Sequence, residues 1–373
     1  MAKLGEVCKL NMGQSPDSSS YNDTGDGIPF FQGNADFGEI HPNIRVWCNA
    51  PTKIAHPGEI LISVRAPIGA MNIADCECCI GRGLASISAD EAICTTKYLW
   101  YGISSKIEEL NAKGTGSTFK AVNKKTLEET EIPIRDLMEQ ERIAANLDRV
   151  TALMSLRKQQ LAKLDELVKA RFVEMFGDPV NNPMNYPKSH LGKVCDVRDG
   201  THDSPEYYDV GYPLVTSKNV TGGKIDLSEC NLISEDDYKK ICERSKVDRG
   251  DIIMPMIGTV GKPVIVNIEP MFAIKNVALI KFTLNSLVTN IYIKTLLESD
   301  YFDRAVLDKI RGGTQKFIAL GDIRKLEIIL PDLKHQLCFS AFVERVDQQK
   351  QTVQQSLEKL ELMKKALMQE YFG

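Results

Sequence analysis

The sequence lacks the features that would place it in a membrane or mark it for export. No apolar run reaches the roughly 20 residues that span a bilayer, and the N-terminus shows no signal-peptide pattern. Ten cysteines without such a signal are typical of reduced thiols, so we expect a cytoplasmic protein. The net charge of −4 argues against a chain that coats nucleic acid without sequence preference, although local basic patches remain compatible with it.

Motifs for catalysis and for binding metals or cofactors are also missing. The five histidines have no metal-ligand spacing, and neither H-E-x-x-H nor G-x-S-x-G occurs. The segment 114–120 resembles a phosphate loop but lacks the G-x4-G-K-[ST] spacing. Cys76, Cys78 and Cys79 contain one C-x2-C pair, whereas a zinc site usually needs a second pair. We therefore expect structural thiols, no metal, no cofactor held by this chain and no catalytic residue.

What the sequence does contain is one long internal repeat. Residues 149–150 recur as 345–346, and 175–177 recur as 371–373, both with an offset of 196 residues. Segment 4–8 also recurs, with a small shift, as 191–195. A repeat of this length indicates a duplicated domain with a duplicated helix rather than a solenoid unit. The resulting internal two-fold character suits a partner with two halves, of which DNA is the commonest.

The globular parts of the repeat are predicted to be α+β. Short β-branched runs bounded by Gly or Pro, at 60–64, 252–257 and 277–282, predict strands. Helical stretches are predicted at 96–110 and 286–310. Strands and helices do not alternate regularly, which favours α+β over a βαβ architecture.

A long helix follows each globular part. Asp136 is expected to cap the first helix, with Glu139 in the capping-box position, and Asp332 is the equivalent cap of the second. Apolar residues recur at steps of four and three over more than four heptads, which predicts that the two helices pair antiparallel as a coiled coil. The predicted helix–helix packing residues are Leu147, Val150, Leu161, Leu164, Val343, Val346, Leu357 and Leu360.

Charged residues interrupt both apolar seams. Arg157 and Arg171 lie in the first seam, and Lys350 and Lys364 lie in the second. They either fix the helix register or face a partner protein, or they cover the seam with their stems while their charged heads reach water. The predicted organisation of the chain is a first globular domain at 1–135, a long helix at 136–177, a linker at 178–190, a second globular domain at 191–331 and a second long helix at 332–373.

Residue types that bind DNA occur at matching places in both copies. Arg82 and Lys275 align approximately, and a basic residue kept in both copies fits a sequence-independent phosphate contact. Arg65 aligns with Ile257, and the loop 14–21 aligns with 199–208, so the residues that could read base edges differ between copies. The candidate DNA-binding residues are Gln14, Ser15, Ser18, Tyr21, Arg65, Arg82, Ser117, Thr118, Lys120, Thr201, His202, Tyr207, Lys218, Asn219, Lys262, Lys275, Arg311, Thr314, Gln315 and Lys316.

Each candidate also has a structural explanation. A single Lys or Arg is commonly a solvated surface charge, and loops diverge after duplication. The Gly-rich segments at 114–120 and 311–316 are either tight turns or donors to a DNA backbone.

In this order and duplicated, these features resemble the specificity (S) subunit of type I restriction-modification systems over essentially the full chain. The resemblance rests on the two half-repeats, the two long helices and several local patterns. These patterns are Gly58-Glu59-Ile60-Leu61, Arg65-Ala66-Pro67-Ile68-Gly69, the Gly-Ser/Thr loop ahead of Ile132-Pro133, and the helix exit Phe176-Gly177-Asp178-Pro179 with Asn182-Pro183.

The resemblance implies two target recognition domains separated by two long antiparallel coiled-coil helices, in a pseudo-two-fold arrangement. Each domain would read one half of a split double-stranded DNA site. The helices would set the spacer and dock two methyltransferase (M) subunits, which carry S-adenosylmethionine. Restriction (R) subunits, which use ATP, would join that core, and this chain would have no catalytic activity. A helix of about 60 Å spans roughly 18 base pairs, which fits such a ruler. Because both repeats are whole, we expect a complete subunit.

Two other classes of protein stay open from the sequence. A standalone DNA methyltransferase or nuclease requires a cofactor motif or an acidic cluster, and binding of S-adenosylmethionine by the isolated chain would support it. A scaffold that docks proteins through coiled coils would bind no DNA. Binding to a split DNA site that requires an M-type partner would discriminate against the scaffold. The sequence determines neither the DNA target nor the spacer length.

Overall fold

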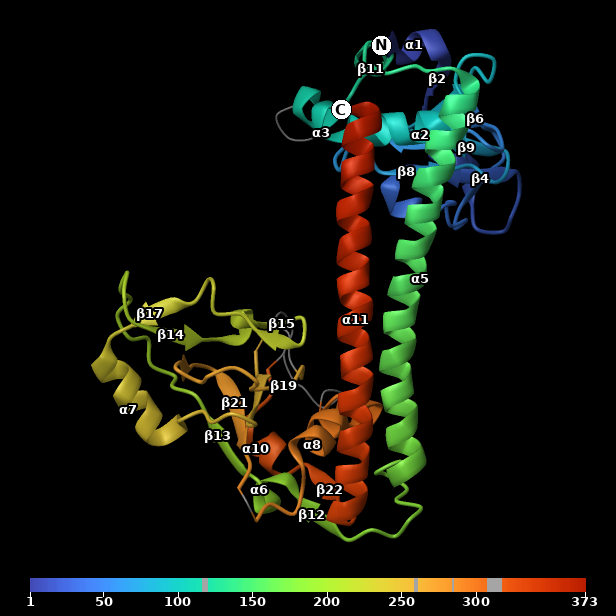
Figure 1. The fold of residues 1–373 in the computed structure, drawn as a ribbon. Coiled ribbons are helices and arrows are strands. Elements are labelled where there is room, and N and C mark those ends of the chain that lie inside the picture. The colour runs from blue at the N-terminus through green and yellow to red at the C-terminus, as the bar shows by residue number, and fades with distance from the viewer. Residues whose placement is uncertain (116–119, 258–260, 284, 307–316) are drawn as a thin grey trace. The chain divides into compact units, whose positions relative to one another are not determined.

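A computed structural model describes residues 1–115, 120–257, 261–283, 285–306 and 317–373 (Figure 1). The chain forms two compact units, the first from Met1–Lys158 with Gln355–Gly373 and the second from Gln159–Gln354. The long helices α5 (Leu137–Phe176) and α11 (Leu333–Phe372) each contribute one part to each unit. The C-terminal part of α5 therefore belongs to the second unit, and the C-terminal part of α11 belongs to the first unit.

The first unit consists of short strands and helices around its parts of α5 and α11. Its strands are β1 (Ala2–Lys3), β2 (Cys8–Met12), β3 (Tyr21–Asn22), β4 (Ile28–Phe31), β5 (Trp47–Cys48), β6 (Ile54–Ala55), β7 (Ile60–Ser63), β8 (Met71–Ile73), β9 (Cys78–Ile80), β10 (Leu84–Ala89) and β11 (Glu131–Ile132). Its helices are α1 (Leu4–Val7), α2 (Thr96–Ser105), α3 (Ile107–Lys113) and α4 (Lys124–Glu128), with the 3-10 turns η1 (Ser18–Ser20) and η2 (Asn34–Asp36).

The second unit has a corresponding set of elements and one additional helix, α7. Its strands are β12 (Lys188–His190), β13 (Asp196–Asp199), β14 (Tyr212–Val215), β15 (Val220–Thr221), β16 (Lys224–Ile225), β17 (Asn231–Ile233), β18 (Ile252–Pro255), β19 (Val264–Ile265), β20 (Ala273–Ile274), β21 (Val277–Lys281) and β22 (Glu327–Ile329). Its helices are α6 (Leu191–Val194), α7 (Glu235–Ser245), α8 (Asn290–Leu297), α9 (Asp300–Ala305) and α10 (Leu320–Arg324), with the 3-10 turn η3 (Ser217–Asn219).

The two units repeat one sheet topology. The antiparallel order β2-β10-β7-β8 in the first unit corresponds to β13-β21-β18-β19 in the second. A second sheet in each unit contains one parallel pair, β4 with β9 and β14 with β20. A two-stranded sheet, β1-β11 or β12-β22, lies at the entry of each long helix. Mostly antiparallel sheets with interspersed helices confirm the predicted α+β class.

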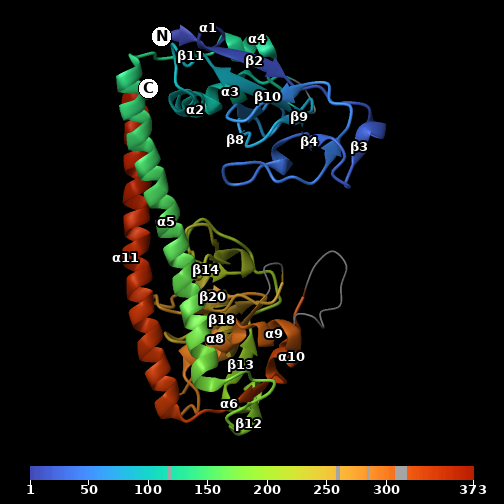
Figure 2. The same ribbon diagram turned by 90° about the vertical axis from the view of Figure 1, so that its right-hand side faces the viewer.

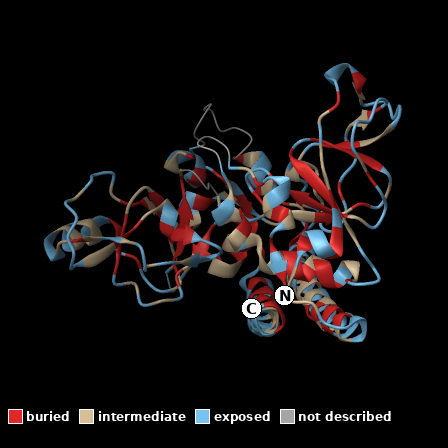
Figure 3. Cartoon of the chain, turned by 90° about the horizontal axis from the view of Figure 1, so that it is seen from above, coloured by how far each residue is buried: buried red, intermediate tan, exposed pale blue. Residues whose placement is uncertain are grey.

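The central sheet of each unit is buried on both faces, because its apolar residues do not alternate with polar ones. In β7, Ile60 and Ile62 pack with α2 and the long helices, whereas Leu61 packs with the second sheet. In β18, Ile252 and Met254 pack toward α8, whereas Ile253 faces the second sheet. Figure 2 shows α2 and α3 beside the β2-β10 sheet of the first unit, and Figure 3 shows buried residues concentrated in the strands of both units.

The predicted helical stretches are interrupted in the structure. The stretch 96–110 divides at Lys106 into α2 and α3. The stretch 286–310 contains α8 and α9, and its last four residues lie outside the described part of the chain. Thr95 and Thr289 cap α2 and α8, with each side-chain oxygen accepting a hydrogen bond from the backbone N–H three residues later.

One buried glutamine in each long helix joins that helix to the globular part of its own copy. Gln140 Oε1 accepts a hydrogen bond from the N–H of Thr95 (2.9 Å), and its Nε2 donates to the carbonyls of Ile93 and Arg135 (both 2.8 Å). Gln336, 196 residues later, is bonded in the same way. Its partners are the N–H of Thr289 (2.9 Å) and the carbonyls of Leu287 (3.0 Å) and Pro331 (2.8 Å). This pair was not predicted from the sequence, because a lone Gln in an amphipathic helix has the pattern of a surface residue.

Aromatic side chains dock the far end of each long helix on the globular part of the other copy. The Phe372 ring of α11 lies 4.9 Å from the ring of Tyr98 in α2. The Phe176 ring of α5 lies 5.1 Å from Tyr292 and 5.4 Å from Phe339. Phe176 and Phe372 occupy the same position in the repeat, so the duplication is preserved in these contacts.

Within each unit the two helix segments run antiparallel, as predicted. The eight predicted packing residues are all buried or half-buried. In the second unit, Lys350 of α11 forms an ion pair with Asp165 of α5 at 2.5 Å, which raises its pKa although burial alone would lower it. Arg171 pairs with Glu174 and lies over the ring of Phe342. These two seam charges therefore have partners inside the helix pair. In the first unit, burial beside Lys158 lowers the pKa of Lys364.

The start of α5 is fixed by a local polar contact. The N–H of Glu139 donates to Asp136 Oδ1 at 2.9 Å, which confirms Asp136 as the N-cap of α5. The Glu139 carboxylate binds Arg142.

Lys188–His190, which falls in the predicted linker, pairs with β22 and so is already part of the folded unit. None of the described helices is long and apolar enough to cross a membrane.

Candidate nucleic-acid interface

A cavity of about 660 Å³ in the first unit brings together five of the predicted DNA-binding residues. Those residues are Ser15, Ser18, Tyr21, Arg65 and Arg82. They come from three separate loops, which meet because β10 lies between β2 and β7 in the central sheet. The cavity wall is completed by Pro16, Gln32, Gly33, Asn34, Ser63, Ala66 and Gly83.

The Arg82 side of the cavity is a tight turn between β9 and β10. The N–H of Arg82 approaches Ser15 Oγ at 3.4 Å, which ties this turn to the loop after β2. A Cβ on Gly83 would lie 2.2 Å from the carbonyl oxygen of Gln32, so only glycine allows this close approach. The Arg82 side chain is exposed and lines the cavity.

Arg65 enters the cavity from the loop after β7, and hydrogen bonds hold this loop in place. The buried Ser63 hydroxyl donates to the carbonyls of Arg65 (2.8 Å) and Pro67 (2.9 Å). The N–H of Ala66 donates to the carbonyl of Lys120 at 3.1 Å. The backbone is thus fixed on both sides while the Arg65 side chain remains exposed.

The cavity is electropositive although the chain is acidic. Its wall contains two arginines and no Asp or Glu. Among the described residues, neither Arg65 nor Arg82 forms an ion pair, whereas Arg45, Arg142 and Arg198 each do. The Tyr21 ring stacks on Phe30 at 4.6 Å, and burial raises the pKa of its hydroxyl. The arrangement offers hydrogen-bond donors and positive charge to an anionic or acceptor-rich ligand.

Gln32 and Asn34 also line this cavity and were not among the predicted residues. They lie just after β4, a segment in which no candidate DNA-binding residue was predicted. Their side-chain amides can donate and accept hydrogen bonds, the combination that suits a base edge. Their residue type is the one sequence feature that could have indicated a role in binding. This feature is weak, because Gln and Asn are common in loops of every kind.

The second unit places Thr201 and His202 at the positions of Gln14 and Ser15. The N–H of Gln14 donates to the carbonyl of Ile80, and the N–H of Thr201 donates to that of Ile274. Lys275 follows Ile274 directly and donates to Ser204 Oγ at 2.6 Å. The turn that carries Lys275 is therefore the counterpart of the turn that carries Arg82, as the sequence predicted.

His202 lies between two acceptors. Its Nδ1 is 3.0 Å from Asn276 Oδ1, and its Nε2 is 2.9 Å from Asp199 Oδ2. Two acceptors favour the imidazolium form, in which both ring nitrogens carry a proton. The hydrogen bond to Asn276 raises the pKa of His202 most, and the hydrogen bond to Asp199 raises it further. Asp199 is buried, which works to raise its own pKa, but the hydrogen bond from His202 and the charge of Arg244 outweigh burial and lower it.

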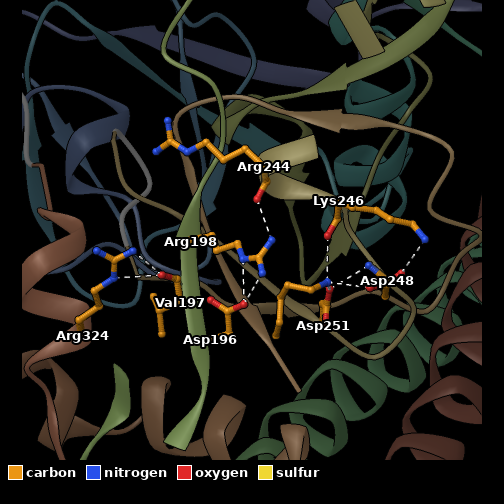
Figure 4. A network of polar contacts seen from close by, with 9 residues as sticks. Asp196, Val197, Arg198, Arg244, Lys246, Asp248, Asp251 and Arg324 are labelled. Atoms are coloured by element: carbon orange, nitrogen blue, oxygen red, sulfur yellow. Dashed lines mark hydrogen bonds and ion pairs between the residues drawn. The ribbon is translucent and has the colours of Figure 1, made fainter. Parts of the chain in front are cut away.

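Arg244 belongs to a wider polar network, and Figure 4 shows its backbone contact with Arg198. The guanidinium of Arg244 pairs with Asp199, and its backbone carbonyl accepts a hydrogen bond from Arg198 at 2.8 Å. Arg198 pairs in turn with Asp196. Nearby, Lys281 bonds Asp248 at 2.8 Å and the buried Asp251 at 2.6 Å. These contacts fix α7 and the end of β13, and hence the backbone that carries His202.

The pKa of His202 is expected to fall when Asn276 is replaced by alanine, because the first of its two acceptors is lost. In the wild-type chain, the protonated His202 ring contributes to the free energy of unfolding. This contribution is fully present below the pKa of histidine in the unfolded chain, about 6.5, and is lost as the pH rises through the raised pKa of His202 in the folded chain. The ring is largely exposed, so this contribution is expected to be under about 1 kcal/mol. An NMR titration of the His202 ring measures the change.

A matched control for this titration is Asn231→Ala, which removes an exposed asparagine of the same unit. It is expected to leave the His202 titration midpoint in place. If Asn276→Ala also left the midpoint in place, the hydrogen bond to Asn276 would not be a cause of the shift.

The remaining described candidates are not among the residues that line the cavity, although the Lys120 carbonyl holds the Arg65 loop through the hydrogen bond from Ala66. Lys120, Tyr207, Lys218 and Lys262 are exposed. Asn219 is 8% exposed, and its Oδ1 accepts hydrogen bonds from the N–H (3.0 Å) and hydroxyl (2.9 Å) of Thr216, so it stabilises the turn η3. Ser117, Thr118, Arg311, Thr314, Gln315 and Lys316 lie outside the described residues.

The cysteine cluster is not among the residues that line the cavity. Cys78 and Cys79 are buried in β9, and burial raises the pKa of Cys78 to about 12. In the described part of the chain, no group of three or more His, Cys, Asp or Glu side chains could hold a metal ion.

The fold and these sites define a duplicated α+β chain with equivalent candidate recognition loops in its two units. The chain matches the family described as type I restriction modification DNA specificity domain over residues 1–166 and 183–362. It therefore belongs to the type I restriction-modification DNA specificity family.

Individual relatives cover different shares of the chain. The putative type I restriction enzyme MjaX specificity subunit of Methanocaldococcus jannaschii is 42% identical over 161 residues, which make up 43% of this chain and 38% of that protein. The MjaIX specificity subunit of the same organism is 26% identical over 336 residues, covering 80% of this chain and 74% of that protein. The solved type I restriction-modification system S subunit from M. genitalium has the same fold, with a TM-score of 0.59, 15% identity, and coverage of 100% of this chain and 95% of that chain.

Proposed function

We propose that this chain is the DNA-recognition subunit of a type I restriction-modification complex and that each unit reads one half of a split DNA site. The observation that carries the proposal is the combination of conserved scaffold and divergent loops. The turn at Arg82 and its counterpart at Lys275 keep a basic residue, whereas the loop at Arg65 carries Ile257 in the other unit. Two modules that both bind DNA but read different sequences need a shared scaffold with backbone contacts and side chains that differ where bases are read.

The long helices are proposed to set the spacing of the two half-sites and to dock the methyltransferase subunits. Each helix is 40 residues long and runs from one unit into the other. Both helices carry exposed apolar residues that are available for docking, among them Leu153 and Leu156 of α5 and Leu362 of α11. The chain itself is proposed to be non-catalytic and to bind no cofactor. S-adenosylmethionine would be bound by the methyltransferase subunit and ATP by a restriction subunit.

Co-expression of this chain with a type I methyltransferase (M) subunit tests the proposal. Long-read sequencing of the host DNA is expected to show N6-methyladenine at one split motif, with two short defined halves around a fixed gap. Methylation at a single continuous motif would contradict reading by both units. No new methylation despite a stable complex would favour the scaffold alternative, and binding of S-adenosylmethionine by the isolated chain would favour the enzyme alternative.

A further inference from the structure

We propose that Arg65 reads a guanine in the half-site bound by the first unit, while Arg82 contacts the DNA backbone there. The inference rests on the proposed function, since it names the base that one unit recognises. It commits the electropositive cavity to one occupant, the major-groove edge of a G·C pair.

The division of roles between the two arginines comes from comparing the units. The Arg82 turn lies between strands that are held by the hydrogen bonds from Gly13 to Leu84 (2.9 Å) and from Gln14 to Ile80 (3.0 Å). The Lys275 turn is held by the corresponding bonds of Gly200 and Thr201. A basic side chain kept at one place in two modules with different targets fits a contact to phosphate, which carries no sequence information.

Arg65 occupies the opposite kind of position, one where the scaffold is kept and the side chain changes. Arg65 forms a β-bridge with Ala121, and Ile257 forms the equivalent bridge with Phe317. The adjoining hydrogen bonds also correspond, from Val122 to Val64 and from Ile318 to Met256, both at 2.9 Å. The backbone is the same at both positions, but the side chain of Ile257 has no hydrogen-bond donor. A contact made by the Arg65 guanidinium is therefore specific to the first unit.

The chemistry of the cavity selects guanine among the four bases. A guanidinium has donors only, and guanine presents two adjacent acceptors, O6 and N7, in the major groove. Adenine and cytosine place an amino group beside or in place of those acceptors, and thymine offers a single acceptor beside a methyl group. The cavity wall has no carboxylate that would neutralise Arg65. The anchored loop holds the Arg65 backbone before DNA arrives, which limits the entropy lost on binding.

The test uses the complex of this chain with its methyltransferase and DNA duplexes in which each pair of the mapped half-sites is varied in turn. Arg65→Ala is expected to lose about 10-fold to 100-fold discrimination at one G·C pair in one half-site, with the other half unaffected. Arg65→Gln is expected to shift the preference there toward A·T, since an amide pairs with adenine. Arg82→Ala is expected to weaken binding to all sequences alike and to reduce the salt slope of log K by about 1.

Arg249→Ala is the matched control, because Arg249 is an exposed arginine outside both candidate sites. Thermal unfolding of each complex checks the fold, and Arg65→Lys, which keeps the charge but loses the two-donor fork, serves if the alanine variant does not fold. A split motif with unchanged discrimination in the Arg65 variants, or a uniform loss across sequences, would overturn the inference while the proposed function stands. If the wild-type complex recognised no split motif, both would fall.

Discussion

Replacing Gln336 by alanine is expected to lower the free energy of unfolding by about 3–5 kcal/mol, and Gln140→Ala is expected to have the same effect. Both side chains are fully buried. Each substitution leaves one backbone N–H and two carbonyls without their partner, and each such group costs about 1–3 kcal/mol when it stays dry. Urea unfolding of the full chain, followed by circular dichroism, measures the loss.

The control for this pair is Gln348→Ala, at an exposed position of α11. It is expected to change the free energy of unfolding by no more than about 0.5 kcal/mol. Hydrogen exchange should locate the damage, in α2 for Gln140→Ala and in α8 for Gln336→Ala, because their N-terminal residues lose the bond from Thr95 or Thr289. A loss below about 1 kcal/mol for both variants would mean that water replaces the glutamine amide.

Phe176→Ala is expected to lower the free energy of unfolding by about 3–5 kcal/mol, because it opens a cavity among three other aromatic rings. Phe176 is fully buried and contacts the rings of Phe172, Tyr292 and Phe339. The same substitution at Phe372 is expected to cost less than at Phe176, since Tyr98 is its one aromatic neighbour among the described residues. Denaturant unfolding of both variants gives the comparison.

The two phenylalanines dock the helix ends, so their loss should also affect function. Phe176→Ala is expected to reduce methylation at the split motif at temperatures where the wild-type complex is active. Val173→Ala, an exposed position on α5, is the control and should cost under about 0.5 kcal/mol. If Phe176→Ala were as mild as this control, the aromatic cluster would not be what joins α5 to the second unit.

The sequence by itself determined the duplication, the α+β class, the long helices and their apolar seams. These properties follow from local patterns: a shared offset between copies, runs of β-branched residues between turns, and a repeat of four and three residues. The cap at Asp136 and the basic pair at Arg82 and Lys275 were equally visible, since each depends on a few neighbouring residues or on matching the copies.

Only the tertiary structure decided which segments meet. The division of α5 and α11 between units, with Phe176 and Phe372 docking on the other copy's globular part, depends on contacts between residues far apart in the chain. The cavity that joins Ser15, Arg65 and Arg82 depends on strand order, which places β10 between β2 and β7. Local periodicity sets which face of a strand is apolar but not which strand lies beside it. For the same reason the buried roles of Gln140 and Gln336 could not be predicted, because their partners are fixed by the fold and not by their neighbours in sequence.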